Sequence, residues 1–258
     1  MATLREALCD REPVCGTWVS IGHPAVAELS AELGFDFVLI DTEHTSTGID
    51  RLEELIRAVD AAEGDAAPLV RVPWNDPVRI KRALDAGAAG LMVPMIETGE
   101  DAEAAVEAMR YPPEGIRGTA PSRASAYGRR FEEYFEAAND ELVTIVQVES
   151  AEGVENAAAI AAVEGVDAVL VGHGDLSASI GAFGEWDGEA FQEALGRIVE
   201  AAHAEGTPVG MLALSDEDIR RWTDAGVDFL IVGADISYIT EGAADARETF
   251  EEIVRGRE

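Results

Sequence analysis

Two apolar runs decide the fold of this chain: Leu142-Val-Thr-Ile-Val-Gln-Val-Glu149 and Asp167-Ala-Val-Leu-Val-Gly-His-Gly-Asp175. A segment of helical composition, Ala151–Val163, lies between them. This order predicts a strand, a helix and a second strand, and each run closes on one carboxylate. In such a unit Glu149 and Asp175 leave neighbouring parallel strands at the same end of the sheet, which is where α/β folds place their ligand sites.

The same alternation continues along all 258 residues. The strand candidates are near-continuous apolar runs, which are typical of parallel strands covered on both faces. The predicted strands are Val14–Ser20, Phe35–Asp41, Pro68–Val72, Gly90–Pro94, Leu142–Val148, Asp167–Gly172, Thr207–Leu212 and Asp228–Val232. The predicted helices are Pro24–Leu33, Asp50–Ala62, Pro77–Ala86, Gly99–Met109, Ala151–Val163, Gly188–Glu205, Asp216–Asp224 and Ser237–Arg255. This pattern favours a single-domain (β/α)8 barrel over residues 1–258, with an open doubly wound sheet as the alternative.

Composition limits the partners and the setting of the protein. Acidic residues number 51 against 19 basic ones, the formal charge is −32, and Lys81 is the only lysine. Such a field repels nucleic acid and anionic membranes, so we expect neither as a partner. The charge is tolerable where salt screens it, which favours a halophilic protein over an ordinary acidic one.

The chain is expected to be cytoplasmic. No apolar run approaches the roughly 20 residues that span a bilayer, and the first residues lack the pattern of a signal peptide. Cys9 and Cys15 have no metal-site spacing and are expected to be reduced thiols rather than a disulfide or a zinc site.

A histidine and an arginine follow two of the predicted strands. His44 closes Asp41-Thr-Glu-His44, and histidine is the side chain best suited to acid–base chemistry near neutral pH. Asp85, in Leu84-Asp85-Ala86-Gly87, is a candidate partner for His44, or else a solvated carboxylate on a helix surface. Arg71 ends an apolar run, where its charge needs a partner. It would offer a planar fork to a substrate carboxylate or make a structural ion pair.

Glu149 and Asp175 offer hard oxygen donors suited to Mg²⁺ or Mn²⁺, with Co²⁺ also compatible. The alternative is that one carboxylate caps the next helix and the other joins an ion pair. Gly174, next to Asp175, would let a backbone amide approach a substrate closely. The connection from 111 to 140 is far longer than the usual connection of about 2–6 residues. It is therefore expected to carry function, and Ser122 within it is a candidate substrate-binding residue.

One mechanistic inference follows from residue types alone. A Schiff-base enzyme needs a lysine, and Lys81 lies inside the predicted helix Pro77–Ala86, a poor place for the nucleophile of a barrel enzyme. Activation of a carbonyl group by this chain is therefore expected to rely on a metal ion.

These residues lie in motifs that resemble one family, the HpcH/HpaI aldolases, which are class II pyruvate aldolases of aromatic and sugar-acid degradation. The resembling segments span most of the chain in family order. They are Gly16-Thr-Trp, Ile40-Asp-Thr-Glu-His44, Leu69-Val-Arg-Val-Pro-Trp-Asn-Asp76, Val93-Pro-Met95, Arg110-Tyr-Pro-Pro-Glu-Gly-Ile-Arg-Gly118, Val146-Gln-Val-Glu149 and Val171-Gly-His-Gly-Asp-Leu-Ser177.

The resemblance implies roles for individual residues. Glu149 and Asp175 would bind the divalent metal, and His44, oriented by Asp85, would be the base. Arg71 would bind the pyruvyl part of the substrate. The family also implies a homo-oligomer, hexameric or built from trimers, with the last helix packed on a neighbouring subunit. One departure is visible, because His173 stands where the family motif has proline.

The implied reaction is reversible cleavage of a 4-hydroxy-2-oxo acid into pyruvate and an aldehyde. A lyase acting on a CoA thioester, or an oxaloacetate decarboxylase, would use related metal–enolate chemistry and is the first alternative. Arg123, Arg129 and Arg130 form the one basic region that a CoA phosphate would suit. The second alternative is a catalytically silent barrel that only binds a carboxylate.

The halophile hypothesis predicts how stability depends on salt. Because molar KCl shortens the Debye length to about 3 Å, it should screen the repulsion among the acidic residues. We expect the free energy of unfolding to rise toward molar KCl in denaturant titrations. A stability that stays level or falls would contradict the hypothesis.

Overall fold

Eight parallel strands close into a barrel in the computed structural model, which describes residues 3–255. The strand order follows the chain from β1 to β8, and β8 pairs with β1. This confirms the predicted (β/α)8 barrel and excludes the open sheet. The strands are β1 (Val14–Val19), β2 (Phe37–Asp41), β3 (Ala67–Arg71), β4 (Gly90–Val93), β5 (Val143–Val148), β6 (Ala168–Val171), β7 (Val209–Ala213) and β8 (Phe229–Ala234).

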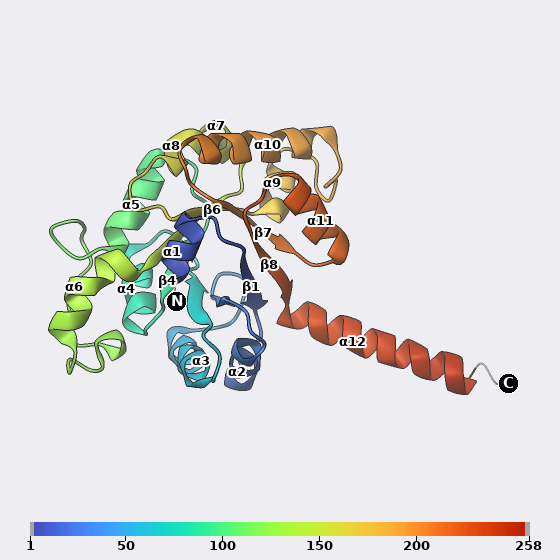
Figure 1. The fold of residues 1–258 in the computed structure, drawn as a ribbon, viewed down its shortest axis with the longest axis horizontal. Helices are drawn as coiled ribbons and strands as arrows, with labels where there is room; N and C mark the ends of the chain where they lie inside the picture. The colour runs from blue at the N-terminus through green and yellow to red at the C-terminus, as the bar shows by residue number, and fades with distance from the viewer. Residues whose placement is uncertain (1–2, 256–258) are drawn as a thin grey trace.

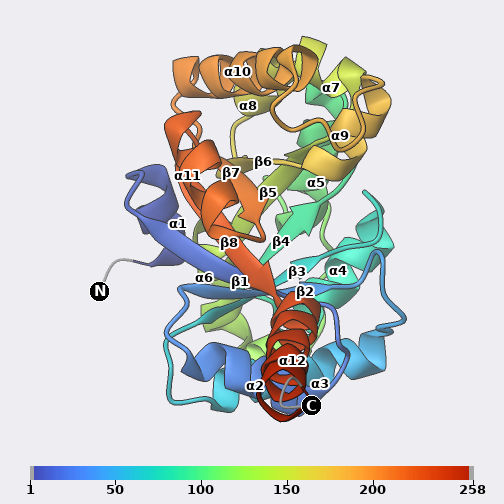
Figure 2. The same ribbon diagram turned by 90° about the vertical axis from the view of Figure 1, so that its right-hand side faces the viewer.

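Helices surround the barrel (Figures 1 and 2). They are α1 (Leu4–Cys9), α2 (Pro24–Glu32), α3 (Ile49–Ala61), α4 (Pro77–Asp85), α5 (Gly99–Met109), α6 (Phe131–Glu141), α7 (Ala151–Glu155), α8 (Ala157–Ala161), α9 (His173–Ser179), α10 (Glu189–Ala204), α11 (Asp216–Asp224) and α12 (Asp235–Phe250). A short 3₁₀ turn, η1, covers Arg123–Ser125, and the π-helical turn η2 covers Glu251–Arg255.

Several details of the helices differ from the prediction. The expected helix Ala151–Val163 is divided into α7 and α8 at Asn156, whose side-chain amide donates to the Glu97 carbonyl at 2.8 Å. The turn of α9, immediately after β6, was not expected because glycines flank its first residue. The short α1 was also not expected.

The strands divide their side chains between two apolar layers, since successive residues of a strand point to opposite faces. In β2, Leu39 joins the layer that fills the inside of the barrel, whereas Val38 and Ile40 join the layer between strands and helices. Helix α1 closes the amino-terminal end of the barrel, because Leu8 packs into the inner layer and the Arg5 guanidinium lies 2.7 Å from the Asp167 carboxylate. The carboxyl ends of the strands are therefore the open end.

Helix α12 leaves the barrel, as Figure 1 shows. Its first residues pack on β1 and β8, but residues 241–250 are all exposed. Its apolar side chains Ile239 and Phe250 are 56% and 54% exposed. Across residues 3–255, none of the helices combines the length and the apolar character needed to cross a membrane.

Packing inside the barrel predicts that alanine substitutions at two glycines change the free energy of unfolding by very different amounts. A Cβ added at Gly16 would lie 2.2 Å from ring atoms of Phe37, which is fully buried. We expect Gly16→Ala to lower the free energy of unfolding by about 1–3 kcal/mol through overpacking. The control is Gly242→Ala on exposed α12, where no atom lies within 4 Å of the new Cβ and the change should be neutral or stabilising by up to about 1 kcal/mol. Equal effects in denaturant titrations of the two variants would contradict this packing.

Candidate active site

The open end of the barrel holds a pocket of about 550 Å³. Five of the residues predicted from the sequence line it, and they come from four different strand ends: His44, Arg71, Glu149, Gly174 and Asp175. The expectation that the two carboxylates share one end of the barrel is confirmed.

Arg71 is held on three sides. Asp41 and Arg71 stand opposite each other at the ends of β2 and β3, and the Nε and Nη2 atoms of Arg71 each donate to the Asp41 carboxylate at 2.8 Å. Its Nη1 atom lies 3.0 Å from Glu43 Oε2, and its guanidinium lies 4.4 Å from the centre of the Trp18 ring. The structural ion pair therefore exists, but the guanidinium still faces the pocket and has N–H donors beyond those that these contacts use.

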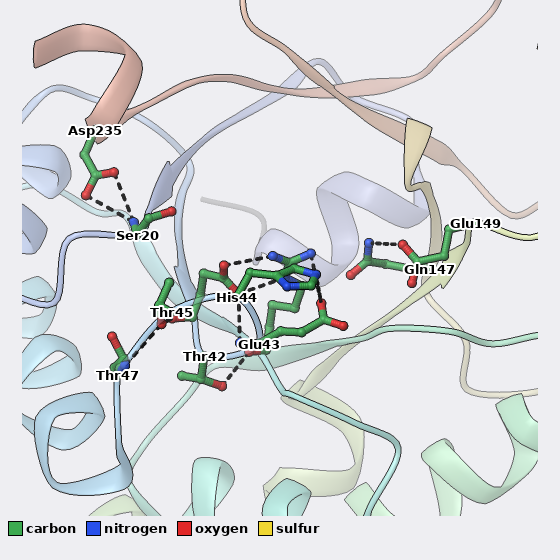
Figure 3. Close-up of polar contacts among 11 residues, drawn as sticks. Ser20, Thr42, Glu43, His44, Thr45, Thr47, Gln147, Glu149 and Asp235 are labelled. Carbon is green, nitrogen blue, oxygen red and sulfur yellow. Dashed lines mark hydrogen bonds and ion pairs between the residues drawn. The ribbon is translucent and has the colours of Figure 1, made fainter. Parts of the chain in front are cut away.

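His44 lies at the mouth of the pocket, with 68% of its side chain exposed (Figure 3). Its Nε2 atom is 3.8 Å from Glu43 Oε2, which also faces Arg71. Burial raises the pKa of Glu43, while Arg71 and then His44 oppose the rise, and the negative charges of Asp41 and Asp175 add to it. An exposed imidazole beside a half-buried carboxylate can exchange protons with a substrate.

Glu149 is 3% exposed and is held by two donors. The Met95 backbone N–H donates to its Oε1 atom at 2.7 Å. Gln147 Nε2 donates to its Oε2 atom at 3.0 Å, as Figure 3 shows. Met95 takes the left-handed conformation, with φ of 53°, which costs energy in a non-glycine residue. Gly172 allows the carboxylate to sit close, since a Cβ there would lie 2.1 Å from Glu149 Oε2.

Negative charge accumulates around Glu149. Burial raises its pKa to about 7, the Met95 hydrogen bond works against the rise, and the charges of Glu43 and Asp175 reinforce it. Asp175 lies in the first turn of α9 and is exposed to the pocket. Two carboxylate side chains that repel each other in one pocket fit a divalent cation. Within residues 3–255 no group of three or more His, Cys, Asp or Glu side chains could hold a metal ion.

Two predicted site residues lie elsewhere. Asp85 ends α4 and its carboxylate pairs with Arg117 at 3.0 Å, so the expected contact with His44 is not formed within this chain. The physical reason is that α4 starts near the carboxyl end of β3 and runs back, which carries its last residue to the opposite end of the barrel.

Ser122 also lies at the amino-terminal end. The adjoining Ala124, together with Tyr134 of α6, borders a cavity with the first residues of β3 and β5, Ala67 and Val143. The Ser122 hydroxyl is buried and does not line the pocket. Within this chain, Ser122 therefore does not reach the pocket that the connection was expected to serve.

Several residues of the pocket were not singled out from the sequence. Gln147 is one, although it stands two residues before Glu149 on β5 and must share its face. Its amide oxygen is buried without a hydrogen-bond partner among the described residues. Trp18 is another. His173, the departure from the family motif, packs its ring against Trp186 at 5.0 Å between centroids.

The comparisons with known proteins agree with this geometry. A profile of the family described as HpcH/HpaI aldolase/citrate lyase matches residues 15–241. The chain is 43% identical over 241 residues to the hydroxypyruvate/pyruvate aldolase of Delftia acidovorans, which covers 93% of this chain and 88% of that protein. It is 40% identical over 248 residues to the 5-keto-4-deoxy-D-glucarate aldolase of Escherichia coli, which covers 95% of each.

A crystal structure agrees as well. The HpcH/HpaI aldolase/citrate lyase family protein from Burkholderia cenocepacia J2315 superposes with a TM-score of 0.93 at 38% identity, covering 97% of this chain and 100% of that one. The chain therefore belongs to the HpcH/HpaI aldolase/citrate lyase family. The prediction of an aldolase, a carbon–carbon lyase, is confirmed at this level.

The pKa of Glu149 predicts how stability of the metal-free protein depends on pH. The pKa is about 7 when folded against 4.5 for the ordinary group, so the folded state holds this proton more tightly. Stability must then fall as the pH rises from about 4.5 to about 7, by up to about 3 kcal/mol from this residue. We expect Glu149→Gln to remove this contribution to the fall in the free energy of unfolding with pH, as measured in thermal and denaturant melts.

The matched control for this prediction is Asp216→Asn, because the Asp216 side chain is 87% exposed on α11. It should keep the wild-type slope. A Glu149→Gln variant whose stability declines with pH as steeply as the wild type would show that Glu149 ionises normally in the folded chain.

Proposed function

We propose that this chain catalyses the reversible, divalent-metal-dependent cleavage of a 4-hydroxy-2-oxo acid into pyruvate and an aldehyde. One observation carries the proposal. A buried carboxylate, Glu149, and a second one, Asp175, share a pocket with a fixed guanidinium, Arg71, and an exposed imidazole, His44. This set matches the needs of an enolate-forming lyase: a cation site, an anchor for a carboxylate and a base.

Glu149 and Asp175 would hold the cation, with Mg²⁺, Mn²⁺ and Co²⁺ all compatible with their oxygen donors. When bound, the ion would supply Lewis-acid stabilisation of the negative charge that develops on the 2-oxo group. The raised pKa of Glu149 supports this assignment, because burial and neighbouring negative charge disfavour its ionised form until a cation is present.

His44 would accept the proton of the 4-hydroxyl group, directly or through a water molecule. The C3–C4 bond then breaks, the aldehyde leaves, and the electron pair remains on the pyruvate part as its enolate. A proton returned to C3 completes pyruvate. The exposure of His44 at the mouth of the pocket suits this role, because the aldehyde end of the substrate must point toward the mouth in order to leave.

Arg71 would bind the pyruvyl part and stabilise the enolate through its remaining N–H donors. Its contacts with Asp41, Glu43 and Trp18 fix its orientation before the substrate arrives. A cation that is already aligned loses little side-chain entropy on binding, which favours the transition state.

The CoA-thioester alternative finds less support. The basic region expected to receive a CoA phosphate includes Arg123, whose guanidinium donates to the Ala86 carbonyl at 2.8 Å and pairs with Asp60. Ala86 follows the last residue of α4, at the amino-terminal end of the barrel. A phosphate held there would be remote from Glu149. Decarboxylation of oxaloacetate would use the same pocket residues and stays an alternative reaction.

The association of the chain with further copies of itself belongs to the proposal too. Residues 241–250 of α12 are exposed, and Ile239 and Phe250 present apolar surface there. Together with the resemblance, this supports a homo-oligomer in which α12 packs on a neighbouring subunit. The halophilic character, which the formal charge of −32 supports, and the cytoplasmic location also remain proposals.

Loss of the base or of the metal should abolish most of the activity. We expect His44→Ala to lower kcat for cleavage of a 4-hydroxy-2-oxo acid by about 10²–10⁴, the usual contribution of a general base. Treatment with EDTA should remove activity, and Mg²⁺ or Mn²⁺ should restore it. Pyruvate release is measured by a coupled assay.

His203→Gln is the control for the histidine substitution. His203 Nε2 pairs with Asp228 at 2.8 Å, away from the pocket, so this variant should retain the wild-type kcat. Full activity of the EDTA-treated protein, or of His44→Ala, would refute the mechanism.

A further inference from the structure

The first residues of α12, which we call the root of the helix (235–240), form part of the pocket. Ile236 and Thr240 line it together with Ser20, which follows the end of β1. Beyond the root the helix leaves the barrel, and residues 241–250 are exposed (Figures 1 and 2). One helix therefore supplies both a wall of the pocket and a segment that extends away from the barrel.

One buried carboxylate joins this root to the segment after β1. Asp235, the first residue of α12, is 4% exposed. Its Oδ2 atom accepts from the Ile21 backbone N–H at 2.7 Å, and its Oδ1 atom accepts from the Ile236 N–H at 2.8 Å. The Ser20 N–H donates to both carboxylate oxygens at 3.1 Å, as Figure 3 shows. Asp235 thus holds Ser20 and Ile236, two residues of the pocket wall that come from opposite ends of the sequence.

A bulge near the end of β8 directs the chain into this contact. The pairing register of β1 and β8 shifts just before the two strands end, so β8 has one residue more than β1 there. Gly233 lies in the bulge with a φ of 72°, in the left-handed region that favours glycine. A Cβ at this position would also lie 2.4 Å from the Tyr238 ring. The bulge and its glycine therefore set the position at which Asp235 leaves the strand.

The direction of α12 matters for the shape of the pocket. The helix contains 16 residues and is about 24 Å long, at 1.5 Å per residue. Because its far part is proposed to pack on a neighbouring subunit, a tilt of the helix at its root would displace Ile236 and Thr240. A second contact opposes such a tilt, since the Tyr238 hydroxyl donates to the Val232 carbonyl and lies 3.1 Å from Thr17 Oγ1.

We propose that Asp235 is a positioning residue for the aldol reaction, because its carboxylate fixes the wall of Ser20, Ile236 and Thr240 against the aldehyde part of the substrate. The inference rests on the proposed aldolase function and deepens it. Arg71 and the metal-binding carboxylates follow β3, β5 and β6, whereas this wall belongs to β1, β8 and α12. A change at Asp235 therefore leaves enolate formation intact and impairs the use of the aldehyde.

Asp235→Asn tests the proposal. Asparagine keeps one acceptor oxygen but turns an NH₂ group toward a backbone donor, so at least one of the three N–H groups loses its partner. In aldol addition of pyruvate to propanal, with Mg²⁺ or Mn²⁺ present, we expect KM for propanal to rise at least about tenfold. Exchange of the C3 protons of pyruvate with deuterium, followed by NMR without aldehyde, should stay within about twofold of the wild type.

Asp167→Asn is the matched control for a purely structural effect. Asp167 is 5% exposed, and its carboxylate also accepts a backbone N–H, that of Thr144 at 2.8 Å, but it lies at the amino-terminal end of the barrel. This variant should lower the free energy of unfolding without changing KM for propanal. A KM that is unchanged in Asp235→Asn, or that rises equally in Asp167→Asn, would overturn the proposal.

A second variant decides the matter if Asp235→Asn does not fold. Tyr238→Phe removes the other contact that holds the helix root and keeps the Asp235 carboxylate. KM for propanal should rise in this variant too, again without a change in deuterium exchange. An unchanged KM would show that the position of the root does not affect the aldehyde, and the proposal would fall.

Failure of this inference and failure of the aldolase function give different results, because deuterium exchange reports enolate formation alone. Metal-dependent exchange in the wild type, together with an unchanged KM for propanal in Asp235→Asn, overturns only the role of Asp235. The absence of exchange in the metal-loaded wild type overturns the proposed function itself.

Discussion

Repulsion between carboxylates at the carboxyl end of the barrel is the constraint on which the rest of the site depends. The parallel strands of a barrel all end on the same rim. Acidic residues that follow several of these strands must therefore lie close together. Glu149 is buried, and its pKa of about 7 reflects its burial and the charges of Glu43 and Asp175. Specific hydrogen-bond donors stabilise this arrangement of carboxylates.

Those donors explain the unusual backbone around the site. Met95 adopts a left-handed conformation and donates its N–H to Glu149, Gln147 donates to the other carboxylate oxygen, and Gly172 leaves room for it. On the opposite side, Asp41 and Glu43 hold Arg71 in one orientation. Strain and repulsion of this kind are typical of sites arranged for a ligand, and a divalent cation would relieve the repulsion.

Much of this was predictable from the sequence. The apolar runs and their spacing predicted every strand of the barrel, and the strand-end positions of Arg71, Glu149 and His44 predicted the pocket they line. Gln147 could have been predicted as well, because it shares a strand face with Glu149.

Other features of the site differ from the expectations for physical reasons. Within this chain, Asp85 and Ser122 lie away from the pocket because helices return the chain to the other end of the barrel, where Asp85 pairs with Arg117. Sequence proximity to a family motif does not carry this three-dimensional information. The contact of the His173 ring with Trp186 depends on tertiary packing, and no local sequence pattern predicts it.

We propose that Glu149 and Asp175 together hold a divalent cation in the pocket. Calorimetric titration of metal-free protein with Mn²⁺ in molar KCl, where surface carboxylates are screened, tests it most directly. We expect one specific ion per chain, lost in both Glu149→Gln and Asp175→Asn and retained in the exposed-carboxylate variant Asp216→Asn. Undiminished Mn²⁺ binding in either of the two pocket variants would contradict it.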